Sequence, residues 1–224
     1  MGNGIGKETR MFTTRIFLVR HGETDWNRTG RFQGRTDMPL NQQGRWQAHA
    51  LASALRDEPL TAIYSSPLMR AKETATLIKT FHPLTPLNEE EGLIEMDLGE
   101  FDGMEAGEWR SQYPDLLETW RNDPASLKMP GGEGLQEVQV RAINTMEHIA
   151  NLYPSGSSLL LCSHNFVNRT ILCFVLGASL NRFRDFQQDP AALNVLCKKE
   201  GQWVAEVIND VSHLKRYEAL SAQI

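Results

Sequence analysis

Two residues near the start of the chain could carry out covalent chemistry on a phosphoester. Arg20 and His21 open the run Arg-His-Gly-Glu-Thr at residues 20–24, directly after the apolar segment 15–19. A neutral imidazole has a nitrogen lone pair that can attack phosphorus and form phosphohistidine, a covalent intermediate. The neighbouring guanidinium binds phosphate through two charge-assisted hydrogen bonds. A single histidine after a strand is more often an ordinary loop residue, so the complete run carries this prediction.

A second histidine occurs in the same setting, between a strand and a helix. His164 follows the apolar run 157–162 and precedes an apolar helix expected over residues 166–176. The run is typical of a buried strand in a parallel sheet. By itself such a histidine is more often a helix cap, but beside His21 it adds a second imidazole to one site.

Arg70 supplies a second guanidinium. The segment Ser-Ser-Pro at residues 65–67 resembles a cap followed by proline in the first helical turn, so we expect a helix over residues 67–80. The start of a helix favours anions because its first N–H groups are unpaired and its dipole is positive there. Alone, Arg70 is more simply a solvated charge, whereas with Arg20 it forms the second side of a phosphate-binding cup.

The elements that must position these residues alternate between strand-length apolar runs and helical periodicity, which indicates an α/β fold with parallel strands. Expected strands lie at residues 15–19, 61–64, 84–87, 157–162, 193–198 and 203–208, and expected helices at residues 41–55, 67–80, 133–152 and 166–176. The last two strands predict a hairpin at the sheet edge. Residues 104–132 predict two short helices, interrupted by Pro114 and Pro124.

Length and composition suit one globular domain. The chain has 224 residues, of which 41% are hydrophobic and 23% charged. We expect the domain over residues 15–214, with a flexible N-terminal tail at 1–14 and a C-terminal tail at 215–224. A net charge of −5 makes nucleic acid an unexpected partner, and no apolar run is long enough to span a membrane.

The cysteines and histidines predict neither disulfides nor a metal site. Cys162, Cys173 and Cys197 lie inside apolar runs without paired spacing, so we expect buried, reduced thiols. Together with an opening segment that lacks an export signal's apolar core, they suggest a cytoplasmic location. The six histidines and three cysteines lack metal-ligand spacing, so we expect no metal and no cofactor.

Several motifs together resemble a known family. The run at 20–24 followed by Trp26 and Asn27, the block at 65–75 and the pattern Glu-x-x-x-Gly-x-(aromatic)-x-Gly from Glu95 occur in order with the second histidine. They resemble the histidine phosphatase superfamily, also called the phosphoglycerate mutase-like family, and its phosphatase branch in particular. The resemblance implies a three-layer α/β/α sandwich with a mostly parallel central sheet, in which the helical insertion 104–132 can act as a lid.

The resemblance also implies catalytic roles. His21 would be the nucleophile, and Arg20, Arg70 and His164 would hold the phosphoryl oxygens. Glu95 would protonate the leaving oxygen and then, as a carboxylate, take a proton from the attacking water. This division of work needs no metal, because the fixed positive donors neutralise the charge on the phosphoryl group.

Four further residues are expected to bind the substrate. The resemblance carries over Asn27, Gln33 and Gly34 as donors to the phosphate. Asn165 follows the second histidine, where most family members have glycine. If the peptide there needs a positive φ, asparagine is the least costly substitute, and phosphate binding would be altered at this point.

Three functions stay open from the sequence. The first is a metal-independent phosphomonoesterase acting on a small phosphorylated metabolite, and segments 94–104, 120–135 and 176–186 are similar to metal-independent phosphoserine phosphatases. The second is a cofactor-dependent phosphoglycerate mutase, although such mutases carry a longer and more basic insertion. The third is a non-catalytic sensor of a phosphorylated ligand, against which the intact nucleophile and acid argue. A homodimer is equally left open.

Overall fold

A computed structural model of the chain describes residues 13–221 and shows six strands in one sheet. They are β1 (Thr14–Arg20), β2 (Leu60–Ser65), β3 (Leu87–Glu89), β4 (Ser158–Ser163), β5 (Leu193–Lys199) and β6 (Gln202–Asp210). Their spatial order is β3-β2-β4-β1-β5-β6. The first four in this order are parallel, and β5 and β6 run antiparallel at the edge. The expected hairpin at the sheet edge is confirmed.

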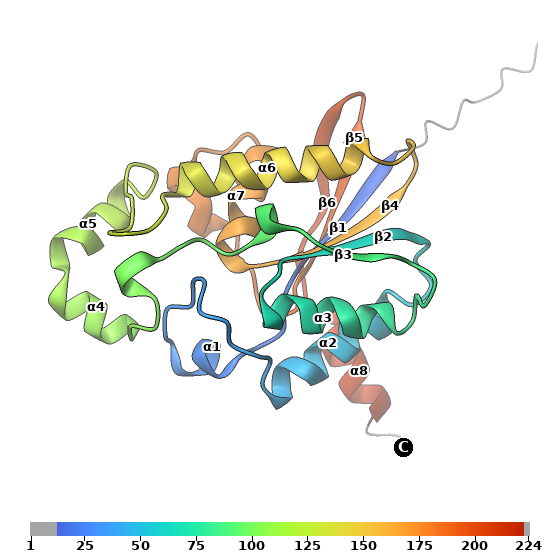
Figure 1. Cartoon of the computed structure of the whole chain (residues 1–224), viewed down its shortest axis with the longest axis horizontal. Coiled ribbons are helices and arrows are strands. Elements are labelled where there is room, and N and C mark those ends of the chain that lie inside the picture. The colour runs from blue at the N-terminus through green and yellow to red at the C-terminus, as the bar shows by residue number, and fades with distance from the viewer. Residues whose placement is uncertain (1–12, 222–224) are drawn as a thin grey trace, which may run out of the picture.

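Helices cover both faces of this sheet, which confirms the three-layer α/β/α sandwich (Figure 1). One layer holds α2 (Gln42–Ala54), α3 (Met69–Lys79) and α8 (Ser212–Ser221), and the other holds α6 (Leu135–Asn151) and α7 (Asn165–Val175). The strands bury alternate side chains on the two faces, as their period of two requires. In β1, Ile16 and Leu18 join the core under α6 and α7, whereas Phe17 and Val19 join the core under α2 and α3.

The insertion lies at one end of the molecule, away from the sheet (Figure 1). It consists of α4 (Ala106–Gln112) and α5 (Pro114–Asn122), so the two predicted short helices are confirmed. Pro114 stands at the first position of α5, where its missing N–H costs no helical hydrogen bond. The remaining short elements are helix α1 (Asp25–Thr29) and the 3-10 turns η1 (Glu91–Leu93), η2 (Gly99–Phe101) and η3 (Leu180–Asp185).

Several expected boundaries differ from the structure, and α6 for example begins at Leu135 rather than at residue 133. Helix α3 begins at Met69 rather than at residue 67, because Leu68 is its extended N-cap residue and Pro67 precedes it. Strand β3 lies three residues later than the segment expected to begin at residue 84. The chain does not become a tail at 215, because α8 continues to Ser221 and packs along α2, with the Tyr217 ring edge-on to Trp46 at 5.8 Å.

The ends and the surface add little to the site. The expected tail at residues 1–14 lies outside the described residues up to residue 12, and Thr14 already belongs to β1. The three cysteines are buried and free, as predicted.

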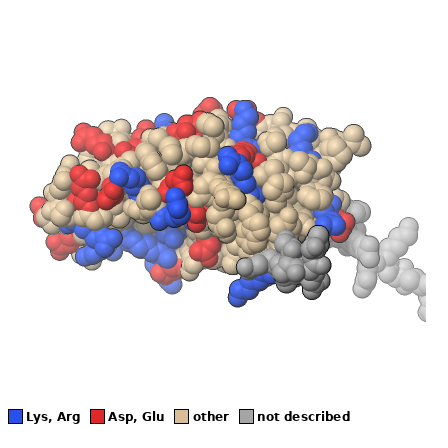
Figure 2. Space-filling view, turned by 90° about the horizontal axis from the view of Figure 1, so that it is seen from below, with Lys and Arg blue, Asp and Glu red and all other residues tan. Residues whose placement is uncertain are grey.

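Within residues 13–221 no helix is long and apolar enough to cross a bilayer. The space-filling view shows Lys and Arg side chains gathered toward the end that carries the insertion, with Asp and Glu side chains around them (Figure 2).

Candidate active site

The carboxyl ends of the parallel strands bring the two histidines together. β1 ends at Arg20 and β4 ends at Ser163, and these two residues are paired in register. His21 and His164 follow directly, and their ring centroids are 5.1 Å apart. Both rings are buried, with 3% and 0% of their surface exposed. The two motifs, 143 positions apart in the sequence, therefore form one site, as ligand sites of parallel sheets commonly do.

The His21 ring is oriented and neutral. Its Nδ1 lies 2.6 Å from the carbonyl oxygen of Gly22, so Nδ1 carries the proton and donates it to that oxygen. The lone pair on Nε2 is thereby left for attack on an electrophile. Burial lowers the pKa of His21 well below its usual value, and the positive charges of Arg70 and Arg20 lower it further.

The Arg70 guanidinium is buried completely and has no acidic partner in contact within the described residues. Its Nη1 donates to Thr36 O at 2.9 Å, its Nη2 donates to Gly34 O at 2.7 Å, and its Nε donates to His164 Nδ1 at 3.2 Å. Burial lowers the pKa of Arg70 to about 10, so it remains charged at neutral pH. A buried charge without an ion-pair partner is costly even when it is hydrogen-bonded, which makes this group a strong attractor for an anion.

His164 links Arg70 to β2. Because its Nδ1 accepts from Arg70, its Nε2 carries the proton and lies 2.7 Å from Ser66 Oγ. Burial and the charge of Arg70 lower the pKa of His164 well below its usual value, so this ring is neutral as well. Ser66 was not singled out from the sequence, although it belongs to the block at 65–75. Only the fold places it against a histidine 98 positions away.

Arg20 is the last residue of β1 and is held by a segment other than the loop that holds Arg70. Its Nη1 donates to Gln188 O at 2.6 Å, and its buried Nε has no hydrogen-bond partner. Burial lowers the pKa of Arg20 to about 10, while Glu95 opposes this shift. Two arginines without ion-pair partners in the described structure thus flank a neutral imidazole. This arrangement can bind a phosphoryl group and stabilise its charge during transfer.

Glu95 is the buried acid of the site, with 3% of its surface exposed. Its Oε1 accepts from Met96 N at 2.9 Å and its Oε2 accepts from Phe166 N, in the first turn of α7, at 3.2 Å. Burial raises the pKa of Glu95, and these hydrogen bonds together with Arg70 and Arg20 only partly offset that effect. A carboxyl group whose proton is retained to higher pH is suited to general acid catalysis.

The backbone that carries Glu95 is held by Arg141 of α6. This guanidinium donates to the carbonyl oxygens of Gly92, Ile94 and Glu95 at 3.0, 2.6 and 3.1 Å. It also forms an ion pair with Glu133 at 2.9 Å. The acid therefore lies on a segment fixed by side chains from a helix that begins 40 positions later.

Glycine is required where the turn after His21 meets α2. A Cβ on Gly22 would lie 2.3 Å from the carbonyl oxygen of Gly44, which no side chain could tolerate. The Gly22 N–H donates to Thr74 Oγ1 of α3 at 3.1 Å. The turn that follows His21 is thus packed against α2 and α3.

Three residues expected to donate to phosphate have other partners in the structure. The Gly34 N–H donates to Asp102 at 2.9 Å, so it is not free for an anion, and the Gly34 carbonyl holds Arg70 instead. The Gln33 amide lies between Thr24 and Arg70, with its oxygen 2.9 Å from Arg70 Nη1 in the orientation that satisfies both neighbours. Asn27 completes a capping box with Thr24, the N-cap residue of α1.

Asn165 does not have the positive φ considered from the sequence. It is the first residue of α7, and the non-glycine residues with positive φ in the described structure are Ala191, Glu200 and Asn209. Asn165 therefore does not adopt the left-handed conformation that would favour glycine at this position. His164 takes the extended N-cap conformation, with φ of −133° and ψ of 176°, which allows the helix to begin directly after it.

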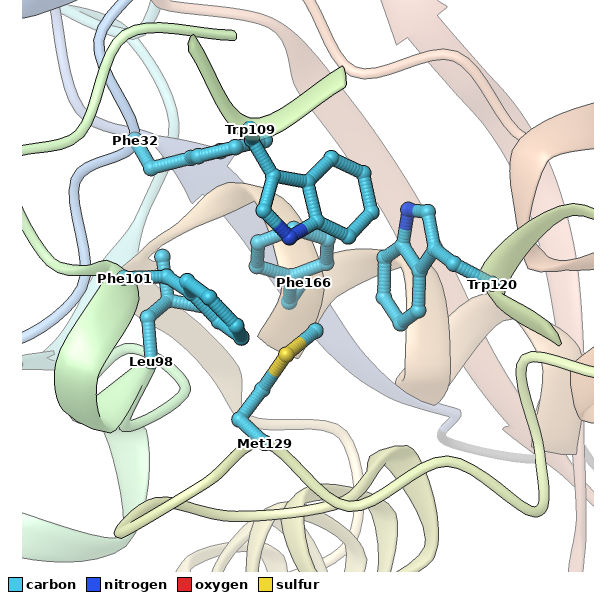
Figure 3. Close-up of a pocket in the computed structure, with 7 residues that line it drawn as sticks. All are labelled: Phe32, Leu98, Phe101, Trp109, Trp120, Met129 and Phe166. Carbon is cyan, nitrogen blue, oxygen red and sulfur yellow. The ribbon is translucent and has the colours of Figure 1, made fainter. Parts of the chain in front are cut away.

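A narrow apolar pocket is formed between the insertion and the body (Figure 3). It is lined by aromatic and aliphatic side chains, namely Phe32, Leu98, Phe101, Trp109, Trp120, Met129 and Phe166. Its volume of about 10 Å³ suffices for roughly one water molecule. The aromatic residues of the insertion were expected either to wall a pocket or to pack onto the body, and Trp109 and Trp120 do both.

The groups around His21 are suited to an anion rather than to a metal ion. Within residues 13–221 no group of three or more His, Cys, Asp and Glu side chains is placed to hold a metal ion. The donors around His21 are guanidinium groups and neutral imidazole, and Arg20 and Arg70 would repel a cation. The site is suited to an anion.

Comparison with known proteins decides the family. The model of the histidine phosphatase superfamily, branch 1, matches residues 16–211. The chain belongs to the histidine phosphatase superfamily. This histidine phosphatase is 34% identical over 203 residues to phosphoserine phosphatase 1 of Hydrogenobacter thermophilus, which covers 91% of this chain and 95% of that protein.

Two further relatives agree with this assignment. A metal-independent phosphoserine phosphatase of Arabidopsis thaliana is 33% identical over 208 residues, covering 90% of this chain and 83% of the relative. The structure of Bacillus stearothermophilus YhfR matches with a TM-score of 0.84 and 30% identity, over 90% of this chain and 99% of that one. The histidine phosphatase described here has the phosphoglycerate mutase-like fold and the function of a phosphoric monoester hydrolase.

Proposed function

We propose that this histidine phosphatase hydrolyses O-phosphoserine without a metal, through a phosphohistidine intermediate on His21. The observation that carries the proposal is the buried, neutral His21, whose Nε2 is free and which is flanked by Arg20 and Arg70. The choice of substrate is supported by relatives named phosphoserine phosphatases.

In the first step the lone pair of His21 Nε2 forms a bond to phosphorus, and the bond between phosphorus and the serine oxygen breaks. Glu95 gives its proton to that oxygen, so serine leaves as a neutral alcohol rather than as an alkoxide. The raised pKa of Glu95 supports this role, because the carboxyl group must enter the step protonated. Arg20, Arg70 and His164 surround the phosphoryl oxygens.

In the second step water attacks phosphorus and the bond to Nε2 breaks. Glu95, now a carboxylate, takes a proton from the water and returns to its starting state. The products are inorganic phosphate and neutral His21. The low pKa of His21, caused chiefly by burial, favours its departure as the neutral imidazole that begins the next cycle.

A rapid-quench experiment with ³²P-labelled phosphoserine in the presence of EDTA tests this proposal. We expect a burst of serine release, and an acid-labile phosphate on the protein that the variant His21→Ala no longer forms. The variant His49→Ala, an exposed histidine of α2, is the matched control and should keep both signals. Loss of wild-type turnover in EDTA would contradict metal independence.

The two alternative functions give different outcomes in the same assay. A phosphoglycerate mutase would convert 3-phosphoglycerate to its isomer faster than it releases phosphate. A non-catalytic sensor would bind phosphoserine without any burst or labelled protein. We expect phosphate release to exceed isomerisation, because the insertion contributes the aromatic side chains of Trp109 and Trp120 rather than basic groups to the pocket beside the site.

A further inference from the structure

A third arginine lies beside the catalytic acid. Arg169 is on α7, three residues after Phe166, so both side chains project from the same side of the helix. Phe166 is the residue whose N–H donates to Glu95 Oε2. Arg169 also interacts electrostatically with Glu95 and with Arg20. Arg169 therefore lies on the same side of the site as Glu95, the group that we propose gives its proton to the leaving alcohol.

Within the described residues, Arg169 makes no hydrogen bond and no ion pair that would hold its guanidinium. Its Nε is buried and makes no hydrogen bond. Within the described residues no carboxylate forms an ion pair with it, whereas Arg141 and Arg182 each pair with an acidic side chain. The carboxylates of Glu95 and Asp189 attract this charge without forming an ion pair with it. Partly burying a guanidinium without a direct ion pair costs free energy, which an anionic ligand would offset.

A second arginine shares the same aromatic support. The Arg169 guanidinium carbon lies 5.8 Å from the ring centroid of Phe183, and that of Arg184 lies 4.8 Å from it. Arg184 is also 5.0 Å from the ring of Trp120. The pKa of Arg184 is lowered by burial and then by the charge of Arg169, so two like charges are held near each other. Holding two like charges near each other costs free energy, and an anion bound beside them would offset that cost.

The aromatic support connects this pair of arginines to the catalytic centre. Phe183 contacts Trp120 at 5.2 Å and Phe166 at 6.1 Å between ring centroids. Trp120 belongs to the insertion and Phe166 to the first turn of α7. The cationic pair is thus connected by ring contacts to Phe166, whose N–H donates to Glu95.

We propose that Arg169, assisted by Arg184, binds a carboxylate on the alcohol part of the substrate. The proposal rests on the proposed phosphomonoesterase function and specifies its substrate class as phosphomonoesters that carry a carboxylate near the ester oxygen. The planar guanidinium fits a carboxylate through two parallel hydrogen bonds. Arg169 is a specificity-determining residue in this scheme, and Arg20 and Arg70 keep the phosphoryl group.

Phosphoserine and phosphoethanolamine provide a direct test, because they differ only in the carboxylate. For the wild type we expect kcat/KM to be higher for phosphoserine. Arg169→Met should lower kcat/KM for phosphoserine roughly 10- to 100-fold, mainly through KM, and should change it less than about threefold for phosphoethanolamine. Continued turnover of phosphoethanolamine shows at the same time that the variant is folded.

Three further variants sharpen the result. Arg169→Lys keeps the charge but loses the forked geometry, so its phosphoserine defect should be intermediate. Arg184→Met should show a smaller defect of the same kind. Arg182→Met is the matched control, because Arg182 is an exposed arginine of η3 that already pairs with Asp185, and it should leave both substrates unchanged.

The outcomes separate this proposal from the proposed function. If Arg169→Met slows both substrates equally, or if the wild type does not distinguish them, carboxylate recognition by Arg169 is wrong while phosphatase activity stands. If the wild type ignores phosphoserine, 3-phosphoglycerate and glycerol 1-phosphate form a second pair, in which a neutral hydroxymethyl group replaces the carboxylate. A preference for 3-phosphoglycerate that Arg169→Met abolishes would support Arg169 and exclude phosphoserine.

Discussion

The cup that Arg20, Arg70 and His164 form around His21 is held together differently from the helical insertion. In the cup, Arg70 of α3 donates to His164, the residue after β4, and His164 donates to Ser66, the residue after β2; all three residues are fully buried. In the insertion, Trp109 and Trp120 are held mainly by contact between rings, and the Trp109 indole nitrogen has no hydrogen-bond partner. One region fixes atoms in place, and the other fills space.

This difference suits the cup to phosphoryl transfer and the insertion to the choice of substrate. Directional hydrogen bonds hold charged donors at one position, which phosphoryl transfer needs because its barrier is lowered by alignment and fixed charge. Ring packing is less directional and tolerates changes of shape. We therefore expect changes in the cup to affect all phosphoesters alike, and changes in the insertion to affect stability and substrate preference.

Removing the acid should give the largest effect and should depend on the leaving group. Glu95→Gln is expected to lower kcat for phosphoserine roughly 10²- to 10⁴-fold, because no proton reaches the serine oxygen. With p-nitrophenyl phosphate, whose leaving group needs no proton, the rate of phosphoryl transfer to His21 should fall much less. Steady-state assays of the two esters measure the contrast, and equal losses would contradict the assignment of Glu95 as general acid.

The pH profile of the wild type follows from the same pair of residues. Activity requires neutral His21, whose pKa burial lowers, so the acid limb should lie well below about pH 6.5. It also requires protonated Glu95, whose pKa burial raises, so activity should fall as pH rises through that shifted value. In Glu95→Gln the alkaline limb should disappear, which a plot of log kcat/KM against pH would show.

Replacing a cup arginine should slow every substrate by a similar factor. Arg70→Met removes a fixed donor and leaves the carbonyl oxygens of Gly34 and Thr36 unpaired, and we expect kcat to fall roughly 10²- to 10³-fold. Arg45→Met is the control, because Arg45 is an exposed arginine that pairs with Glu73. Losses that differ strongly between phosphoserine and p-nitrophenyl phosphate would show that Arg70 contacts the alcohol instead.

Truncating a ring in the insertion should alter stability more than chemistry. Trp120→Ala removes a nearly buried side chain that contacts Phe166 and Phe183, and should lower the free energy of unfolding by about 3 kcal/mol. We expect kcat for p-nitrophenyl phosphate to change less than about threefold. Urea denaturation and steady-state kinetics measure both, and Trp46→Ala on α2 serves as a control far from the pocket. A loss of kcat near that of Arg70→Met would remove the distinction between the two regions.

The smallest effect is expected at the position where the chain departs from its family. Asn165 has a helical backbone, so Asn165→Gly relieves no strain and should destabilise the fold by about 0.5–1 kcal/mol. Activity should stay within about threefold of the wild type. Thermal denaturation and kcat measure this, and a large gain in activity would show that the asparagine side chain obstructs the phosphate.

Much of the fold follows from the sequence because its signals are local. Apolar runs such as residues 157–162 predict strands, and the sheet's edge hairpin follows from two short strands and their turn. The ends of helices differ from those predicted where tertiary contacts override local preference. Pro67 predicts the first helical turn, yet α3 begins at Met69, and α8 extends past residue 214 because it packs on α2.

For the site, the sequence predicted which groups meet but not how each is bonded. His21, Arg70 and His164 converge as expected from their places after parallel strands. Gly34 was expected to donate to phosphate, yet its N–H is taken by Asp102, 68 positions away. Arg169 gave no signal of its own, because its significance depends on missing partners that only a folded structure reveals.

The sequence by itself determined the family and made His21 the residue proposed as nucleophile, because strand, histidine and glycine must be adjacent along the chain for that turn to form. The tertiary structure alone decided which His21 nitrogen is free and that Arg20 and Arg70 lie near it without an ion-pair partner among the described residues. Those properties depend on burial and on hydrogen bonds between distant segments. Local sequence encodes the residue, whereas its protonation and partners are set by what surrounds it in space.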